Sequence, residues 1–354
     1  MKGKVISIAS VSCRVDTADG IYECAARRRL TESDTGQTKP FAVGDEVILE
    51  PTGPREGVVT EVLPRRTRLS RAQPHDRRAE HVVVANVDQL LIVCSVREPP
   101  LTVGIIDRYI IAAQSGGIEP VVCINKIDLA PEPVELVLRS EPQPRKVAYE
   151  DIAALYSALG FRVRPVSART GAGVEELKAD LIGRTTVLAG HSGVGKSSLI
   201  NAIQPGLKLK TGTVTRRGRH ITANVSLLKL QFGAYVVDTP GVREFSLWDI
   251  KKRDVAEFFP DIWDLAPNCK MSDCSHVHEP DCAVKRALER GELSRIRYDS
   301  YVGILESVGH WSVPRETDVE RPREQIARSK RNLSRSTRKQ QLKERWRAQL
   351  GEDQ

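Results

Sequence analysis

A glycine-rich segment near the middle of the chain carries residues suited to binding phosphate. Residues 190–197 read Gly-His-Ser-Gly-Val-Gly-Lys-Ser, a G-x-x-x-x-G-K-S motif between an expected strand at 185–189 and an expected helix at 196–203. The glycines let backbone N–H groups curl around phosphates, and the helix N-terminus favours the same anion. We predict that Lys196 reaches the β- and γ-phosphates as a catalytic group and that Ser197 ligates Mg²⁺. The loop residues predicted to contact the nucleotide are Gly190, His191, Ser192, Gly193, Val194, Gly195, Lys196, Ser197 and Ser198.

Two more motifs follow expected strands and indicate which base is bound. Residues 125–128 read Asn-Lys-Ile-Asp, and this N-K-x-D resembles the guanine-recognition motif of translation-factor-type GTPases. The carboxylate of Asp128 can accept hydrogen bonds from guanine N1–H and the 2-amino group, a pair that adenine does not offer. Residues 167–171 read Ser-Ala-Arg-Thr-Gly and resemble the S-A-x-T-G loop that covers the base through a backbone N–H. The residues predicted to recognise guanine are Asn125, Lys126, Ile127, Asp128, Ser167 and Ala168.

The last motif predicts the γ-phosphate end of the site. Residues 238–241 read Asp-Thr-Pro-Gly, a D-x-x-G in which Asp238 would hold Mg²⁺ and the amide of Gly241 would sense the γ-phosphate. The segment 207–224 is the expected γ-phosphate-sensing loop, with Thr222 as its metal-contacting residue. In ordinary small GTPases the phosphate loop precedes the base-recognition motifs, whereas here it follows them. This order indicates a circularly permuted GTPase, a rearrangement that keeps spatial contacts when the original termini lie close together.

The residue that would orient the attacking water is missing from its usual place. In Ras-like enzymes a glutamine follows D-x-x-G, but Val242 stands here and has no hydrogen-bonding group. We therefore expect slow intrinsic hydrolysis unless another group positions the water. His220 is the candidate within the chain, because an imidazole can orient water or donate to developing charge. An alternative is a GTP-gated RNA-binding adaptor with negligible hydrolysis, which Val242 favours and His220 and Asp238 disfavour.

Three thiols and an imidazole gather within fourteen residues in the C-terminal half. The spacing Cys269-x4-Cys274-x-His276-x5-Cys282 supplies soft sulfur and nitrogen ligands in tetrahedral number, which suits one structural Zn²⁺ with no open position. Binding would stabilise a small helical region that has little core of its own. His278 is a further candidate ligand, and the spacing does not choose between the two histidines. The other four cysteines stand apart and do not resemble a disulfide framework.

Composition and patterning divide the 354 residues into four expected domains or segments. Residues 1–80 contain short β-like runs and predict a small barrel, an OB-fold that binds RNA. Residues 81–248 alternate strand and helix, which predicts an α/β P-loop GTPase domain whose mostly parallel sheet is covered on both faces. Residues 249–312 are expected to be a helical zinc-binding domain. Residues 313–354 form a basic tail, expected to be disordered or helical on RNA.

The distribution of charge and of apolar residues narrows the class of partner. The whole chain has a net charge of +8, and residues 321–347 alone hold eleven Lys/Arg against two Asp/Glu. Such a tail favours a nucleic-acid partner, whereas the arginines near residues 27–29 and 65–71 are equally compatible with nucleic-acid binding and with a solvated surface. No stretch reaches the roughly 18 uncharged apolar residues of a membrane helix, so we expect a cytoplasmic monomer without a membrane partner.

The parallel-sheet strands are expected at 82–86, 90–94, 121–125, 163–167, 186–190 and 234–238, and the barrel strands at 4–8, 21–25, 46–49 and 57–63.

Together these motifs resemble the circularly permuted, small-ribosomal-subunit-dependent GTPases that act late in bacterial subunit assembly. The resemblance covers about residues 1–310, and the permuted order followed by C-x4-C-x-H-x5-C is highly specific. It implies an OB-fold, a permuted GTPase domain and a zinc-bearing helical domain. It also implies slow GTP hydrolysis stimulated by the small subunit, contact with its rRNA, and a checkpoint in the release of assembly factors.

The resemblance also bears on single residues. It favours His276 as the fourth zinc ligand and supports a role in hydrolysis for His220. Residues 220–223 read His-Ile-Thr-Ala, whereas the family has an R-H-T-T-T-like stretch, so the metal role is confined to Thr222 or a neighbour. A permuted GTPase that acts on another RNA or on a membrane-bound partner is the remaining alternative, and the absence of an amphipathic anchor disfavours the membrane version.

Overall fold

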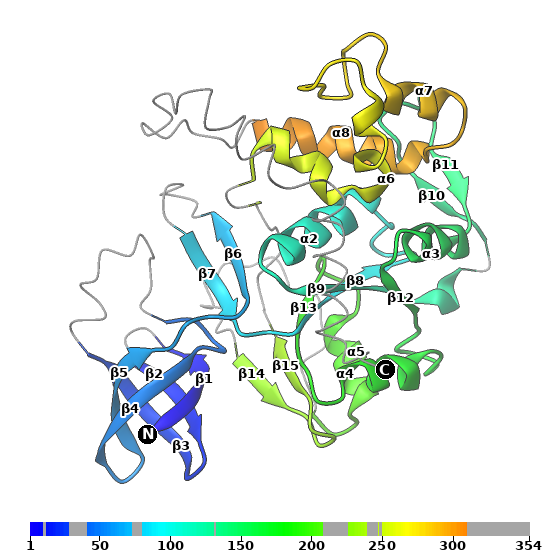
Figure 1. Ribbon diagram of the computed structural model, residues 1–354. Coiled ribbons are helices and arrows are strands. Elements are labelled where there is room, and N and C mark those ends of the chain that lie inside the picture. Colours follow the sequence, from blue (N-terminus) through cyan, green and yellow to red (C-terminus); the bar gives the residue numbers. More distant parts are fainter. Residues whose placement is uncertain are drawn as a thin grey trace, which may run out of the picture. The chain divides into compact units, whose positions relative to one another are not determined.

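The apolar runs between residues 89 and 238 form six neighbouring strands of an eleven-stranded sheet in the computed structural model (Figure 1), whose other five strands come from residues 2–62. The order of these six strands is β12-β9-β8-β13-β15-β14, and all of them except β14 run parallel to one another. The bounds are β8 Gln89–Ser95, β9 Glu119–Asn125, β12 Arg162–Pro165, β13 Thr185–Ala189, β14 Ser226–Lys229 and β15 Tyr235–Asp238. The structure describes residues 1–9, 12–27, 41–72, 80–130, 132–207, 226–238, 247 and 250–309.

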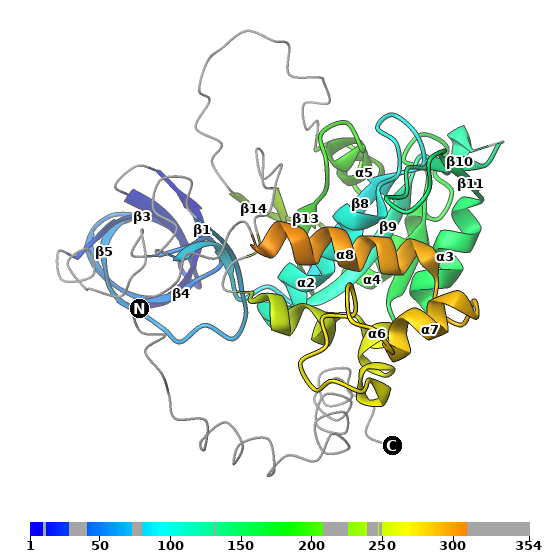
Figure 2. The same cartoon turned by 90° about the horizontal axis from the view of Figure 1, so that it is seen from above.

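Helices cover both faces of this part of the sheet, as the continuous apolar strands predict. Along β8 the side chains alternate: Leu90 and Ile92 face one buried cluster, and Leu91 and Val93 face another. The first cluster is closed by α2 and α3 and the second by α4 and α5, on opposite sides of the sheet (Figures 1 and 2). These helices span α2 Val103–Ser115, α3 Tyr149–Ala158, α4 Val174–Leu181 and α5 Lys196–Ile203. The predicted α/β layer is thereby confirmed.

The N-terminal residues form a closed five-stranded barrel. Its strands pair in the order β1-β2-β3-β5-β4, and β4 pairs back onto β1. The interior is filled by buried Val and Leu side chains, among them Val5, Val15, Val47, Leu49 and Val59. This barrel confirms the predicted OB-type fold, although the sequence did not mark β2 as a strand. The bounds are β1 Lys2–Ile8, β2 Ser12–Thr17, β3 Gly20–Ala26, β4 Glu46–Gly53 and β5 Glu56–Val62.

One apolar run takes a place that the sequence did not predict. Residues 82–86 were expected in the parallel sheet, but β7 Glu80–Ala85 instead pairs antiparallel with β6 Arg68–Ala72 in a separate two-stranded ribbon. The prediction was wrong because an apolar run indicates that a strand is buried, but not which strand it pairs with. Val84 is fully buried, and it packs into the cluster formed by α2 and β8 without joining the parallel sheet. A second small ribbon joins β10 Val134–Leu136 to β11 Arg145–Val147.

Short helices after residue 250 pack around one long helix. They comprise 3₁₀ segments at Lys252–Phe258 and Ala266–Asn268, with α6 Pro260–Trp263, α7 Ala283–Glu289 and α8 Arg295–Gly309. Their buried cluster includes Val255, Phe259 and Ile304, and it also takes in Ile111 from α2. Helix α8 therefore lies directly against α2, which Figure 2 shows from above. We refer to the described residues 250–309 as the helical lobe.

Candidate nucleotide site and metal cluster

The phosphate loop folds between β13 and α5 because its glycines allow two close approaches. A Cβ atom on Gly190 would lie 2.1 Å from the carbonyl oxygen of Val93, and one on Gly195 would lie 2.5 Å from the Nδ2 atom of Asn125. Both glycines also have positive φ, +143° and +95°, where other residues are strained. The loop is thus packed against β8 on one side and against the Asn125 side chain on the other.

Lys196 begins α5, and its ammonium group points back into the loop. Its Nζ atom donates to the carbonyl oxygens of Gly190 at 2.7 Å and His191 at 2.9 Å. The ammonium group is therefore held at the edge of the loop, where the N–H groups at the start of α5 also lie. An anion bound there would meet a full positive charge together with backbone donors.

Asn125 joins the three predicted motifs to one another. Its side-chain amide donates to the carbonyl oxygen of Val194 at 2.8 Å, and its Oδ1 atom accepts from the N–H of Ala168 at 3.2 Å. The residue is almost fully buried, at 1% exposure. One side chain therefore fixes the phosphate loop and the 167–171 loop in a single arrangement at the carboxyl edge of the sheet.

Asp128 is oriented by its neighbours as a hydrogen-bond acceptor. The hydroxyl of Ser167 donates to Asp128 Oδ1 at 2.6 Å, and the guanidinium group of Arg169 lies 3.6 Å from Oδ2. Ser167 is fully buried and its Oγ atom also accepts from the N–H of Thr170 at 3.1 Å. The carboxylate keeps a defined direction, which a two-point contact with a planar base requires.

The structure brings together the predicted residues of three motifs and leaves others outside the described part of the chain. Residues 125–128, 167–168 and 190–198 meet at the carboxyl ends of β9, β12 and β13. Asp238 is the last residue of β15, the neighbour of β13, so its backbone lies at the same edge. His220, Thr222 and Gly241 lie outside the described residues.

The segment 96–102, between β8 and α2, also lines this site, and the sequence motifs did not predict it. The ammonium group of Lys126 donates to the carbonyl oxygen of Glu98. The ring of Pro99 lies beside Gly193, since a Cβ on that glycine would be 3.5 Å from Pro99 Cδ, and the Ser95 hydroxyl donates to the Pro99 carbonyl oxygen at 2.8 Å. One feature could have predicted this: β8 is parallel to β9 and β13, so the residues that follow it leave the sheet at the same carboxyl edge.

The Cys/His cluster is assembled as predicted. The ligand atoms of Cys269, Cys274, His276 and Cys282 all lie within 4.8 Å of one another, and the Sγ atoms of Cys269 and Cys282 are 3.8 Å apart. Tetrahedral zinc with Zn–S bonds of about 2.3 Å places its sulfur ligands about 3.8 Å apart, so this donor set fits zinc. His276 is buried and lies in the cluster, whereas His278 is exposed.

Glu279 fixes the turn that carries the histidine. Its carboxylate accepts from the N–H of Ser275 at 2.9 Å, from the Ser275 hydroxyl at 2.7 Å and from the N–H of Val277 at 3.2 Å. Burial opposes the charge of this carboxylate, but these hydrogen bonds prevail and lower the pKa of Glu279 to about 2. The bonds flank His276 on both sides and hold its backbone at a φ of +66°.

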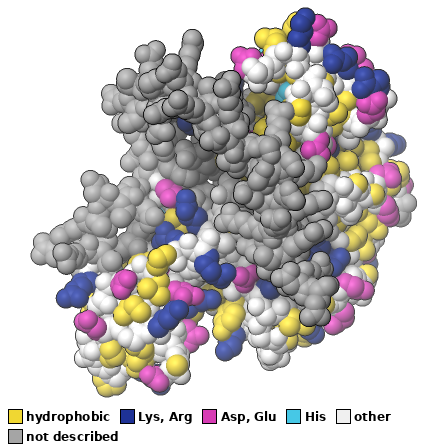
Figure 3. Space-filling model, viewed as in Figure 1, with side chains coloured by type: hydrophobic (Ala, Val, Ile, Leu, Met, Phe, Trp, Pro, Cys, Tyr) yellow, Lys and Arg dark blue, Asp and Glu magenta, His cyan; other side chains and the backbone are white. Residues whose placement is uncertain are grey.

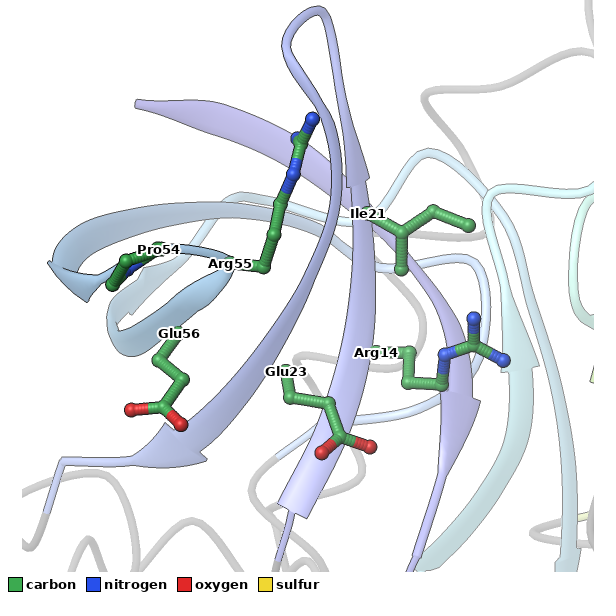
Figure 4. Close-up of a pocket in the computed structure, with 6 residues that line it drawn as sticks. All are labelled: Arg14, Ile21, Glu23, Pro54, Arg55 and Glu56. Atoms are coloured by element: carbon green, nitrogen blue, oxygen red, sulfur yellow. The ribbon is translucent and has the colours of Figure 1, made fainter.

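The arginines that follow the barrel at 65–68 leave less free positive charge than the sequence indicates. Arg65 makes two 2.7 Å hydrogen bonds to the buried carboxylate of Asp45, while Arg66 and Arg68 lie 3.5 Å and 2.8 Å from Asp88 and Glu80. Over the barrel, blue and magenta side chains alternate on the face seen in Figure 3. A depression on the barrel is likewise balanced, because Figure 4 shows two arginines and two glutamates around it. Its lining residues are Arg14, Ile21, Glu23, Pro54, Arg55 and Glu56.

The fold and the order of the motifs define the class of protein. The P-loop strand β13 and the N-K-x-D strand β9 lie in one sheet with β8 between them, and the N-K-x-D motif comes earlier in the chain, which is a circularly permuted GTPase arrangement. Among the helices that the structure describes, none has the length and apolarity needed to cross a bilayer.

Comparison with known proteins agrees with this class and identifies the family. Residues 62–248 match the family described as RsgA GTPase. The chain therefore belongs to the RsgA GTPase family, and it is a GTPase. Two relatives called small ribosomal subunit biogenesis GTPase RsgA are similar to it. The Christiangramia forsetii protein is 33% identical over 86% of this chain and 96% of its own length, and the Thermotoga maritima protein is 42% identical over 75% and 83%.

Two solved structures share the architecture. The crystal structure of YjeQ from Thermotoga maritima has a TM-score of 0.65 and 35% identity, and it covers 87% of this chain and 98% of that one. YloQ, described as a circularly permuted GTPase, has a TM-score of 0.62 and 29% identity over 89% of this chain and 96% of its own. The predicted permutation and three-part architecture are confirmed.

Proposed function

We propose that this GTPase acts in the biogenesis of the small ribosomal subunit, and that the subunit stimulates its hydrolysis of GTP and thereby triggers the release of assembly factors. The observation that carries GTP binding is the bridge made by Asn125 between the phosphate loop and the guanine-recognition loops. The relatives' shared name supports the cellular role. In this role the protein works as a cytoplasmic monomer bound to the subunit and its rRNA.

The proposed residue roles follow the motifs. Asp128 accepts from guanine, with Lys126, Ile127, Ser167 and Ala168 around the base, and the loop 190–198 encloses the phosphates. Lys196 leaves the carbonyl oxygens that hold it and neutralises the charge that develops on the β–γ bridge. A magnesium ion held by Ser197 and Asp238, with Thr222, would bind the β- and γ-phosphate oxygens. Gly241 senses the γ-phosphate. The zinc ion proposed for Cys269, Cys274, His276 and Cys282 has a structural role.

Hydrolysis is proposed to depend on His220, since Val242 cannot position water. We expect His220→Ala to lower the subunit-stimulated rate by about 100-fold, the effect of losing a positioned acid–base or orienting group. GDP affinity should stay unchanged, because the histidine acts on the attacking water and not on the bound nucleotide. Equal stimulated rates in both proteins would assign water positioning to a group on the subunit.

The test of the function compares GTP hydrolysis by the full chain alone, with small subunits, and with large subunits as the matched control. We expect small subunits to raise kcat at least about tenfold, a barrier reduction of about 1.4 kcal/mol, and large subunits to leave it unchanged. Tight GTP binding with no stimulation by either particle would instead support the adaptor function, in which GTP only orders the loops for RNA binding.

The basic tail is proposed to add an RNA contact. Removal of residues 313–354 should flatten the salt dependence of binding to small subunits, because fewer counterions are released from phosphates. An unchanged slope of log affinity against log salt would exclude the tail as a contact.

A further inference from the structure

Helix α8 makes polar contacts with two parts of the protein at once. On one side it meets the turn that carries a zinc ligand, and on the other it meets α2, which leads from the nucleotide site. Both sets of contacts come from a single fifteen-residue helix.

The first set joins α8 to the metal cluster. The hydroxyl of Tyr298 donates to the carbonyl oxygen of His276, and the hydroxyl of Tyr301 donates to that of Ser275, each at 2.8 Å. Tyr301 is buried at 1% exposure and its ring packs edge-on against Phe259. Glu279 holds the N–H groups of the same turn, so the turn that carries His276 is fixed by Glu279 on one side and by α8 on the other.

The second set joins α8 to α2 through a buried charge. The guanidinium group of Arg297 pairs with Asp107 of α2 and lies 3.2 Å from Asp261 of the lobe, and Arg297 and Asp107 are each 1% exposed. The Tyr156 hydroxyl on α3 also donates to Asp107, at 2.8 Å. Removal of either partner alone would leave the other charge unpaired in the interior, so the docked helix requires both Arg297 and Asp107.

Weaker contacts extend the same interface along α8. Asp299 accepts from the N–H and the hydroxyl of Ser140, at 2.9 and 2.8 Å, and Arg108 donates to the Ser307 hydroxyl at 2.9 Å. Arg139 pairs with Glu306. The helix is thus fixed to the GTPase core along most of its length.

Helix α2 directly follows a segment that lines the nucleotide site. Asp107 lies in the first turns of α2, and residues 95–102 precede that helix directly. Within that segment Val96 N–H donates to the carbonyl oxygen of Asn125 at 3.1 Å, and Glu98 accepts from the Lys126 ammonium group. Pro99 lies against Gly193 of the phosphate loop. A shift of the α2 N-terminus therefore displaces groups that contact both the base and the phosphate loops.

We propose that α8 couples the metal cluster to the nucleotide site: bound zinc holds α8 against α2, and loss of zinc loosens residues 95–102 and speeds nucleotide release. The proposal rests on the function above, since it requires that nucleotide binds between these loops. Tyr298, Tyr301 and Arg297 are positioning residues in this scheme. Since coupling between two sites is reciprocal, bound nucleotide must tighten zinc by the same factor by which zinc tightens nucleotide.

The experiment measures both directions on the full chain. Release of fluorescent GDP is followed before and after zinc is removed with a chelator, and zinc affinity is measured by chelator competition with and without GDP. Without zinc, we expect GDP release to quicken and the equilibrium affinity for GDP to fall about tenfold, within the roughly 5- to 150-fold range of allosteric coupling, and GDP to tighten zinc by the same factor. Amide exchange at residues 95–102 should rise in the zinc-free protein.

Variants separate coupling from loss of folding. Tyr301→Phe removes one hydroxyl and keeps the ring, and it should weaken zinc a few-fold and reduce the effect of GDP on zinc affinity. Tyr22→Phe removes a hydroxyl from the barrel and should change neither quantity. Arg297→Met should give fast GDP release that no longer responds to zinc. If Arg297→Met does not fold, Arg297→Lys takes its place, because lysine keeps the positive charge. Its GDP release should respond to zinc to an intermediate degree.

Two results would overturn the coupling. One is GDP release that changes less than twofold when zinc leaves a protein whose helical lobe remains folded by circular dichroism. The other is a zinc affinity that is the same with and without GDP. Failure of the nucleotide site itself looks different, because the zinc-loaded wild type would then bind neither GDP nor GTP. Failure of the proposed cellular role would leave nucleotide binding intact and hydrolysis unstimulated by small subunits.

Discussion

The nucleotide loops and the metal cluster differ in how their residues are brought together. The contact between Asn125 and Val194 joins residues 69 positions apart, whereas Cys269 and Cys282, the first and last ligands of the cluster, are only 13 positions apart. The nucleotide loops rest on a sheet buried on both faces, so their placement follows from apolar packing. The cluster lies in short turns beside a small core, and its stability depends on the ion that joins its ligands. A change in one region should therefore abolish the binding or chemistry of that region itself, and reach the other region only through the modest coupling proposed for α8.

The largest effect is expected from the metal cluster. Cys274→Ala should abolish zinc binding, which contributes about 10–16 kcal/mol of apparent binding free energy in zinc-finger peptides. Metal analysis should fall from one zinc per chain to none, and amide exchange should rise across residues 266–282. His278→Ala is the matched control, since this histidine lies outside the cluster and its loss should leave one zinc bound. A zinc-loaded Cys274→Ala protein would place the metal elsewhere.

The next effect is expected from the phosphate loop. Lys196→Ala should lower the rate of GTP hydrolysis by about 10²–10³, the usual cost of losing a donor to developing charge. Single-turnover kinetics measure this loss, and metal analysis of the same sample should still find one zinc. Loss of zinc in this variant would mean that the two regions do not fold separately.

A change of base preference should follow from Asp128→Asn. In this variant the carboxylate that accepts two hydrogen bonds from guanine becomes an amide, so that an NH₂ donor faces a guanine donor. GTP affinity should therefore fall at least about 100-fold, and xanthosine triphosphate affinity should rise. Competition titrations with both nucleotides measure the exchange. Arg169→Ala removes the exposed ion-pair partner of Asp128 and should alter GTP affinity less than about threefold. Unchanged base preference in Asp128→Asn would remove this residue from the site.

The smallest effect tests the packing between motifs. Gly195→Ala would place a methyl group 2.5 Å from Asn125 Nδ2 and force apart the loops that this amide joins. We expect GDP affinity to fall about tenfold, or about 1.4 kcal/mol, by isothermal titration. Gly160→Ala is the control, because that glycine also has positive φ but has no atom within 4 Å of an added Cβ. Equal affinities in the two variants would show that backbone strain, and not the contact with Asn125, decides the outcome.

Local motifs and periodicity predicted much of this molecule. The helix 196–203 begins and ends at the predicted residues, because the glycine before it and its apolar spacing mark it. The cluster of Cys269, Cys274, His276 and Cys282 could also be predicted, since short spacing limits how far its ligands can separate. The choice between His276 and His278 needed the family resemblance.

Pairings between distant segments could not be predicted. The sequence showed Arg65 as part of a basic run, but nothing near it in the chain indicated its bond to the buried Asp45. Likewise Val82–Ala85 has the composition of a central strand, and only tertiary packing places it in the ribbon with β6. Asp107 and Arg297 are 190 positions apart, so no local pattern relates them. The roles assigned to His220, Thr222 and Gly241 stay predictions, and so do the domain boundaries.

The permuted chain order sets the sequence of events during synthesis. The barrel is made first, then β8 and β9 with residues 125–128, and Lys196 follows Asn125 by roughly 4–14 seconds at about 5–20 residues per second. Strand β1 also waits for β14, its partner across the Ser7–Ser226 pair, until most of the chain exists. A nascent chain therefore makes its barrel and its base-recognition loops before it has a phosphate loop, and nucleotide capture has to wait until Lys196, more than half-way along the 354 residues, has been made.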